Sequence, residues 1–252
     1  MKKFTNESML VIISYLEKEL QNKDEILFEV LNPDVNIDIY AGEILKIENK
    51  EFIYRSYKSW CDLAELLFCK MLISSITLNT VVIKLQKLNK NDSFHKDLND
   101  EKNEKYGEKS TFFRINKNEE PAFLYAYMNA LKNVKIEEKT NILNLGINKA
   151  DEFEIIKEMV NEDIFKQMNF VGVDYSLSAI DFAKKRFPYE NFNFFNHDIN
   201  KLNELNLKKS DLIISIGTLQ SSSLNFKLLF MDLIQNYLED KGSIILGFPN
   251  CR

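Results

Sequence analysis

The chain has 252 residues, of which 45% are hydrophobic and 28% are charged, and its net charge is −5. These values are ordinary for a globular protein with a sizeable core, and they argue against an overall basic field that would recruit nucleic acid. No stretch approaches the roughly 18 apolar residues of a membrane span, and the three cysteines form no CxxC pair or disulfide framework. We therefore expect a cytoplasmic protein with no membrane association and without nucleic acid as a partner.

The first 88 residues mix helical and strand patterns and predict a small N-terminal α+β domain. Helical periodicity covers residues 8–20 and 60–71, and in the second of these helices Cys61 and Cys69 would share a buried face. Apolar or alternating runs with β character follow one another at residues 26–31, 35–40, 43–47, 51–57 and 80–88.

Residues 89–119 are dense in charges of both signs and almost free of aliphatic side chains. Such a composition is typical of a linker, and long segments of this kind inside compact proteins are either functional or disordered. The aromatic and basic residues in it, among them Tyr106 and Arg114, keep a second interpretation open, in which the segment is a lid that folds over a ligand.

From Glu120 onward the pattern becomes regular. Pro121 opens a helix that is predicted to extend to about residue 133. Strands are then predicted at 141–145, 170–174, 192–196, 211–216 and 243–248, with helices at 152–161, 177–187 and 224–238. This alternation predicts βαβ units, and therefore an α/β fold with a doubly wound, mainly parallel sheet over residues 120–252.

In such a sheet, ligands bind at the carboxyl ends of the strands, near the point where the strand order reverses. The first strand ends in a loop that contains Gly146, and the second ends in Asp174. A carboxylate at the tip of the second strand can accept hydrogen bonds from the two hydroxyls of a ribose. The alternative is a capping role, in which Asp174 or Ser176 begins the next helix.

Taken in order, these strand ends resemble the successive motifs of class I S-adenosylmethionine-dependent methyltransferases, which have a Rossmann-like fold. The resemblance covers Glu120 to the C-terminus and implies S-adenosyl-L-methionine as the cofactor and methyl transfer to an unidentified acceptor. Of the three glycine positions in the family's first loop, Gly146 keeps one, and Asn148 and Ala150 occupy the others. Asn144 stands where the family often has an acid, and asparagine tolerates the left-handed backbone that a glycine provides.

The resemblance also implies a role for each strand end. The cofactor site would contain Asn144, Gly146, Asn148, Asp174 and Tyr175, together with Asp198, Ile199, Ser215 and Gly217 from the later strands. Asp174 would bind the ribose, Asp198 the adenine amino group and the Ile199 backbone the adenine ring. Thr218, Gln220 and Asn250 would line the acceptor site. Separately from the resemblance, we expect either Arg114 or Tyr106 of the charged segment to reach the methionine end of the cofactor.

Several of these residues have simpler alternatives. Asp198 would serve equally well as a turn acid, and Gly217 would merely end its strand, with Ser221–Ser223 capping the next helix. No catalytic residue is assigned, because displacement from a sulfonium depends on orientation more than on covalent catalysis. Nothing positions His197 as a general base, and no metal site is expected.

Family members continue past the fifth strand, whereas this sequence ends at Arg252. We therefore expect five parallel strands, with the fifth as a free edge that either pairs with a second copy in a homo-oligomer or is covered by another part of the chain. Two alternatives remain beside the methyltransferase. One is a non-catalytic binding or protein-interaction module derived from the fold, and the weaker one is another enzyme on the same fold, such as an aminopropyl transferase or a nicotinamide-dependent enzyme.

Overall fold

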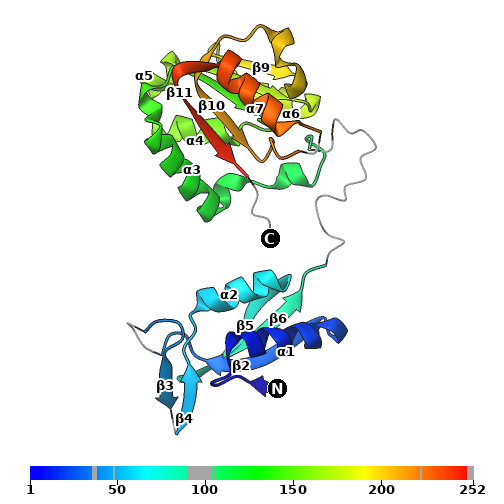
Figure 1. Ribbon diagram of the computed structural model, residues 1–252, viewed down its shortest axis with the longest axis vertical. Helices are drawn as coiled ribbons and strands as arrows, with labels where there is room; N and C mark the ends of the chain where they lie inside the picture. The colour runs from blue at the N-terminus through cyan, green and yellow to red at the C-terminus, as the bar shows by residue number, and fades with distance from the viewer. Residues whose placement is uncertain (36–38, 48, 90–103, 105, 222, 249–252) are drawn as a thin grey trace. The chain divides into compact units, whose positions relative to one another are not determined.

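The computed structural model describes residues 1–35, 39–47, 49–89, 104, 106–221 and 223–248. The chain divides into two compact units, with the boundary after residue 93 (Figure 1). None of the helices in the described part of the chain has the length and the apolar character needed to cross a membrane.

The N-terminal unit is a four-stranded sheet with two helices packed against it. The strand order is β1-β2-β6-β5, in which β1 and β2 are parallel and the other neighbours are antiparallel. The elements are β1 (Lys2–Lys3), α1 (Met9–Asn22), β2 (Glu25–Leu31), the hairpin β3 (Ile44–Ile47) and β4 (Lys50–Ile53), α2 (Tyr57–Leu66), β5 (Cys69–Ile76) and β6 (Thr80–Lys87). Leu16 of α1 and Trp60 of α2 pack with Phe28 and Ile83 of the sheet, so the α+β prediction is confirmed.

Two predictions for this unit were wrong. The helix predicted over 60–71 ends at Leu66, because the backbone turns through a left-handed Phe68 and continues as β5. Cys61 is therefore exposed on a helix while Cys69 is buried on a strand, and the two share no face. The strand predicted at 35–40 falls partly on residues 36–38, which lie outside the described residues, and the described residues at its end, 39–40, are not in a strand.

The C-terminal unit contains the predicted five-stranded parallel sheet, in the order β11-β10-β7-β8-β9. Its strands are β7 (Asn141–Leu145), β8 (Asn169–Asp174), β9 (Phe192–Asn196), β10 (Ser210–Ile216) and β11 (Leu238–Gly247). The chain runs outward from β7 to β9 and then returns to place β10 on the other side of β7. The strand order therefore reverses between β7 and β10, where folds of this type bind their ligands.

Helices cover both faces of this sheet. One face carries α3 (Pro121–Asn133), α4 (Asp151–Met159), α5 (Glu162–Gln167) and α6 (Leu177–Arg186). The other face carries α7 (Phe226–Asp232), the π-helical turn Leu233–Tyr237 and the 3-10 stretch Ile199–Leu205. Because both faces are covered, the strands are nearly continuous apolar runs, as the sequence pattern predicts.

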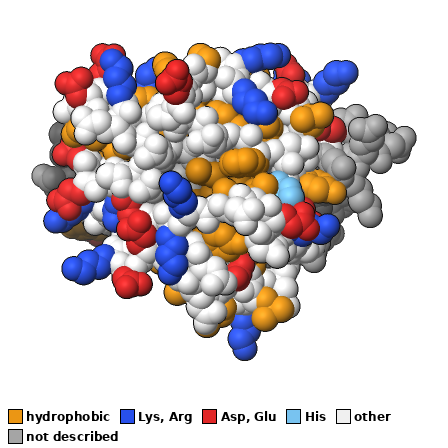
Figure 2. Space-filling model, turned by 90° about the horizontal axis from the view of Figure 1, so that it is seen from above, with side chains coloured by type: hydrophobic (Ala, Val, Ile, Leu, Met, Phe, Trp, Pro, Cys, Tyr) orange, Lys and Arg blue, Asp and Glu red, His pale blue; other side chains and the backbone are white. Residues whose placement is uncertain are grey.

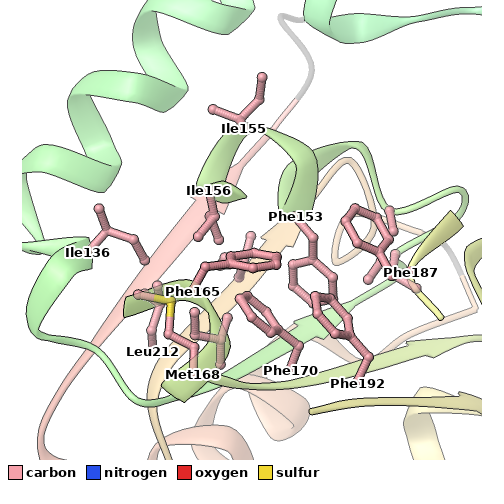
Figure 3. Close-up of a cluster of buried hydrophobic side chains, with 14 of the residues drawn as sticks. Ile136, Phe153, Ile155, Ile156, Phe165, Met168, Phe170, Phe187, Phe192 and Leu212 are labelled. Carbon is pink, nitrogen blue, oxygen red and sulfur yellow. The ribbon is translucent and has the colours of Figure 1, made fainter. Parts of the chain in front are cut away.

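An aromatic cluster joins α4 and α5 to the sheet (Figure 3). Phe153 of α4 lies edge-on to Phe170 of β8, with ring centroids 4.9 Å apart. Phe170 stacks on Phe192 of β9 at 4.3 Å, and Phe165 of α5 packs against both strands. This packing fixes the first turn of α4 against β8 and β9.

Helix bounds in this unit differ from the prediction by two residues or more in two places. The helix predicted over 152–161 is α4, and it ends at Met159; Asn161 then caps the separate helix α5, accepting a hydrogen bond from the backbone N–H of Ile164. The helix predicted over 224–238 begins at Phe226, and Asn225 caps it in place of the serines at 221–223.

Candidate functional site

The loop after β7 and the end of β8 are joined by backbone hydrogen bonds. The N–H of Gly146 donates to the carbonyl of Val173 at 2.8 Å, and the N–H of Asn148 donates to the Asp174 carboxylate, also at 2.8 Å. The predicted loop and the predicted acid are thus in direct contact at the carboxyl edge of the sheet, next to the reversal of strand order.

The three positions at which the resemblance expects glycine all have a left-handed backbone. Gly146 has φ 74°, Asn148 has φ 46° and Ala150 has φ 64°. This is the region that glycine adopts freely and that asparagine tolerates better than most residues. Although positions 148 and 150 are not glycine, the loop therefore keeps the backbone conformation of a glycine loop.

Thr218 covers Gly146 from the loop after β10. A β-carbon at Gly146 would lie 1.9 Å from the Thr218 hydroxyl oxygen, so only glycine fits there. Gly217, with φ 70°, is less crowded, because the nearest atom to a β-carbon there would be the Lys117 ammonium nitrogen at 3.6 Å; its N–H donates to the carbonyl of Gly247 at 2.8 Å. The loops after β7 and β10 thus approach closely at the reversal of strand order.

Asp174 is held by backbone donors and is not the helix cap. Its Oδ1 accepts from the N–H of Ser176 at 2.9 Å, while the Ser176 hydroxyl caps α6 by accepting from the N–H of Ala179. The carboxylate can accept about four hydrogen bonds, so capacity remains for a ligand. Burial raises the pKa of Asp174, the nearby charge of Glu104 raises it further, and the backbone donors oppose the shift.

The turn after β9 lies beside Asp174. The N–H of His197 donates to the Asp174 carbonyl at 2.9 Å, and the Asn196 amide donates to the Tyr175 carbonyl at 2.8 Å. Asp198 accepts from the N–H of Asn200 at 2.9 Å, so it does act as a turn acid, with the Ile199 side chain buried behind it. Tyr175 is exposed. The adenine contacts of Asp198 and Ile199 stay predictions.

The remaining predicted residues lie in different surroundings. Ser215 is buried and donates to the Leu145 carbonyl at 3.1 Å, so it joins β10 to β7. Gln220 is exposed beside Gly217, and Arg114 is exposed on a 3-10 turn. Asn250 lies outside the described residues.

Part of the charged segment packs against this edge of the sheet. The carbonyl of Tyr106 accepts from the Asn148 amide at 2.7 Å, and Lys149 donates to the carbonyls of Phe113 and Ile115 at 3.1 and 2.5 Å. Glu104 accepts from the hydroxyls of Ser176 and Ser178 at the start of α6. Residues 90–103 and 105 lie outside the described residues, so the lid interpretation rests on these contacts of 104 and 106–119.

Two charged residues at the site were missed by sequence reasoning. Glu152, in the first turn of α4, is only 6% exposed, and its carboxylate accepts from the Asn144 amide at 3.5 Å. Burial raises the pKa of Glu152 to about 7, and Lys117 opposes the shift. The Lys117 ammonium also lies 3.6 Å from where a β-carbon of Gly217 would be. The sequence signal for Glu152 was an acid at a helix start, which is normally exposed.

Residues 136–250 match the sequence profile of a family described as a methyltransferase domain. The C-terminal unit is thus similar to the domains of this family, and we call it the methyltransferase domain. No curated protein matches the chain. Among the described residues of the methyltransferase domain and of the N-terminal unit, no group of three or more His, Cys, Asp or Glu side chains is arranged to hold a metal ion.

Solved structures similar to the chain are themselves methyltransferases. The plantazolicin methyltransferase BpumL in complex with SAH is 18% identical, with a TM-score of 0.44, over 57% of this chain and 55% of that chain. A SAM-dependent methyltransferase from Aquifex aeolicus is 16% identical, with a TM-score of 0.38, over 48% and 62%. Coclaurine N-methyltransferase bound to N-methylheliamine and SAH is 17% identical, with a TM-score of 0.41, over 50% and 35%. The chain thus spans about half the length of BpumL.

Proposed function

We propose that the methyltransferase domain binds S-adenosyl-L-methionine and transfers its methyl group to an acceptor that is not identified. The observation that carries the proposal is the position of Asp174. Its carboxylate stands at the reversal of strand order, fixed by the N–H groups of Asn148 and Ser176, and it retains free acceptor capacity. The left-handed loop at 146–150 brings the backbone close to the same place, so the residues present fit the cofactor.

In this reaction the cofactor supplies an activated methyl group on a sulfonium. Asp174 and the loop at 146–150 would hold the cofactor, and its methyl group would pass from sulfur to the acceptor, which would give up a proton to water or a base. The residues of the chain bind and orient, because such a displacement gains most of its rate from a fixed in-line geometry. The loops at 146–150 and 217–220 would provide that geometry from two neighbouring strands.

The first prediction concerns Asp174. Replacing Asp174 with Ala should weaken the binding of S-adenosylhomocysteine by roughly 1.5–3 kcal/mol, which is about 10- to 150-fold, because charged hydrogen bonds to the ribose are lost. Isothermal titration of the full chain measures the affinity. Asp181→Ala is the matched control, since Asp181 is an exposed acid further along α6.

Two results would contradict the proposal. A wild-type chain that binds neither S-adenosylmethionine nor S-adenosylhomocysteine at millimolar concentration would exclude the cofactor. An affinity that is the same in Asp174→Ala and in the Asp181→Ala control would remove the ribose role of Asp174 while leaving cofactor binding intact.

The non-catalytic alternative drew its support from the replaced glycines and from the missing last strands of the fold. Because Asn148 and Ala150 keep the left-handed backbone of a glycine loop, those replacements do not favour a degraded site. The sheet does have five strands, but Asp174 and the loop at 146–150 fit the cofactor, so the methyltransferase is the function we propose.

Two predictions about partners remain: that nucleic acid is not the acceptor, and that two copies of the chain associate through the edge strand β11. Figure 2 shows basic and acidic side chains interspersed over the face turned to the viewer, which supports an acceptor other than nucleic acid for this face.

Among the described residues, β11 pairs only with β10, so one edge of the sheet is open. Association of two copies through this edge and a cytoplasmic location stay predictions, and sedimentation of the purified chain would measure the first.

A further inference from the structure

Glu152 is a buried carboxylate with few partners. It is 6% exposed, and among the described residues its carboxylate has one hydrogen bond to another side chain, the contact of 3.5 Å with the Asn144 amide. Its own backbone N–H also helps the charged form. Buried charges in proteins are normally paired, because removal from water costs several kcal/mol. The poor pairing of Glu152 therefore needs an explanation.

No cation in the described part of the chain pairs with this carboxylate. Lys117 is close enough to influence its charge, yet no lysine, arginine or histidine among the described residues forms an ion pair with it within 4 Å. The side-chain oxygen of Asn118, which contacts the start of α4, is a second unused acceptor. The Asn118 amide donates to the Asp151 carbonyl at 3.3 Å, while its buried oxygen has no partner among the described residues.

Glu152 lies close to the point where the strand order reverses, which is where folds of this type bind their ligands. Asn144, its partner, is the buried polar side chain one residue before the end of β7, next to the reversal of strand order. The Asn144 amide is neutral and brings no charge of its own to this position. The Asn144 amide donates to Glu152, so the two side chains together present one carboxylate beside the end of β7.

We propose that Glu152 binds the ammonium group of the methionine part of S-adenosylmethionine, with Asn144 orienting the carboxylate. The inference rests on the proposed function and deepens it, because it names the group that selects the amino-acid end of the cofactor. A ligand ammonium supplies the counter-charge that the chain itself leaves missing. Glu152 thereby restores, from the next helix, the negative charge that position 144 lacks.

Isothermal titration of the full chain with two ligands tests this assignment. S-adenosylhomocysteine carries the ammonium, whereas 5′-methylthioadenosine has the same nucleoside without the amino-acid part. Glu152→Gln should weaken binding of S-adenosylhomocysteine by about tenfold or more, as expected for loss of a buried charged hydrogen bond. It should change the affinity for methylthioadenosine by less than about twofold. Glu158→Gln, an exposed position on the same helix, should leave both affinities unchanged.

The pH dependence of binding gives a second readout. Two charged groups among the described residues act on Glu152, Lys117 and, on its own helix, Asp151; the titratable Tyr127 hydroxyl of α3 also faces it. With the pKa of Glu152 at about 7, wild-type affinity for S-adenosylhomocysteine should fall by about eightfold between pH 7.5 and pH 6. In Glu152→Gln this fall should disappear.

The outcomes separate the two proposals. If wild-type chain binds S-adenosylhomocysteine and Glu152→Gln binds it equally well, the ammonium assignment is wrong and the proposed function stands. If Glu152→Gln weakens both ligands to the same extent, or keeps the pH dependence of the wild type, Glu152 serves the structure of the loop and the assignment is overturned. A wild-type chain that binds neither ligand overturns the proposed function and this inference with it.

Discussion

Replacing Glu152 with Gln is expected to raise the free energy of unfolding by about 3 kcal/mol at pH 8, but by only about 1 kcal/mol at pH 5. The pKa of Glu152 is about 7 in the folded chain, against 4.5 for an ordinary glutamate. Between these values the folded chain binds more protons than the unfolded chain. The wild type therefore loses stability as pH rises from about 4.5 to 7, and a neutral side chain of the same shape does not.

Denaturant unfolding of the full chain at the two pH values measures this difference. Glu158→Gln should stay within about 0.5 kcal/mol of the wild type at both, because Glu158 is exposed. If Glu152→Gln raised the free energy of unfolding equally at pH 5 and pH 8, Glu152 would have an ordinary pKa in the folded chain. A loss of stability at pH 8 would mean that the charged form has a partner that the described contacts do not include.

Glu152→Gln is expected to have opposite effects on stability and on ligand binding, and both effects follow from one unpaired buried charge. The same substitution should stabilise the chain without ligand and weaken the binding of S-adenosylhomocysteine. A residue that is retained only for stability would show the reverse, or no effect on binding. Opposed effects of this kind are characteristic of groups that are held in an unfavourable state for a ligand.

The sheet of the methyltransferase domain was predictable because each strand is a short apolar run between turns. β7 and β9 were predicted at their observed bounds. The boundary between α2 and β5 was not, since apolar residues at helical spacing continue to Met71 and no glycine or proline marks the left-handed turn at Phe68. Whether apolar residues near such a turn are helix or strand depends on pairing with β6, which is a tertiary contact.

The positions of the site followed from topology, whereas its electrostatics did not. Parallel strands bring their carboxyl ends to one edge, so Asp174 and the loop at 146–150 could be placed together from the sequence. Glu152 was seen only as an acid at the start of a helix. Its burial depends on α3 and on the turn that carries Lys117, segments whose packing no local pattern reveals.

The contact between Gly146 and Thr218 leads to the last prediction. Gly146→Ala should lower the free energy of unfolding by about 3–4 kcal/mol, of which about 1–2 comes from the left-handed backbone and about 2 from overlap of the new methyl group with Thr218. Gly217→Ala is the matched control in the same domain. Its backbone is equally left-handed, at φ 70°, but its β-carbon would have no neighbour closer than 3.6 Å. Gly217→Ala should therefore lower the free energy of unfolding only by the contribution of the left-handed backbone, about 1–2 kcal/mol.

Combining Gly146→Ala with Thr218→Ala isolates the contact by a double-mutant cycle. Removing the Thr218 hydroxyl and methyl takes away the two nearest atoms, so the double variant should recover at least about 1 kcal/mol relative to additivity. Equal losses in Gly146→Ala and Gly217→Ala would show that the loop after β10 does not rest on the loop after β7. That contact joins the proposed cofactor loop to the loop predicted to meet the acceptor, so its coupling energy measures how firmly the two halves of the site are held together.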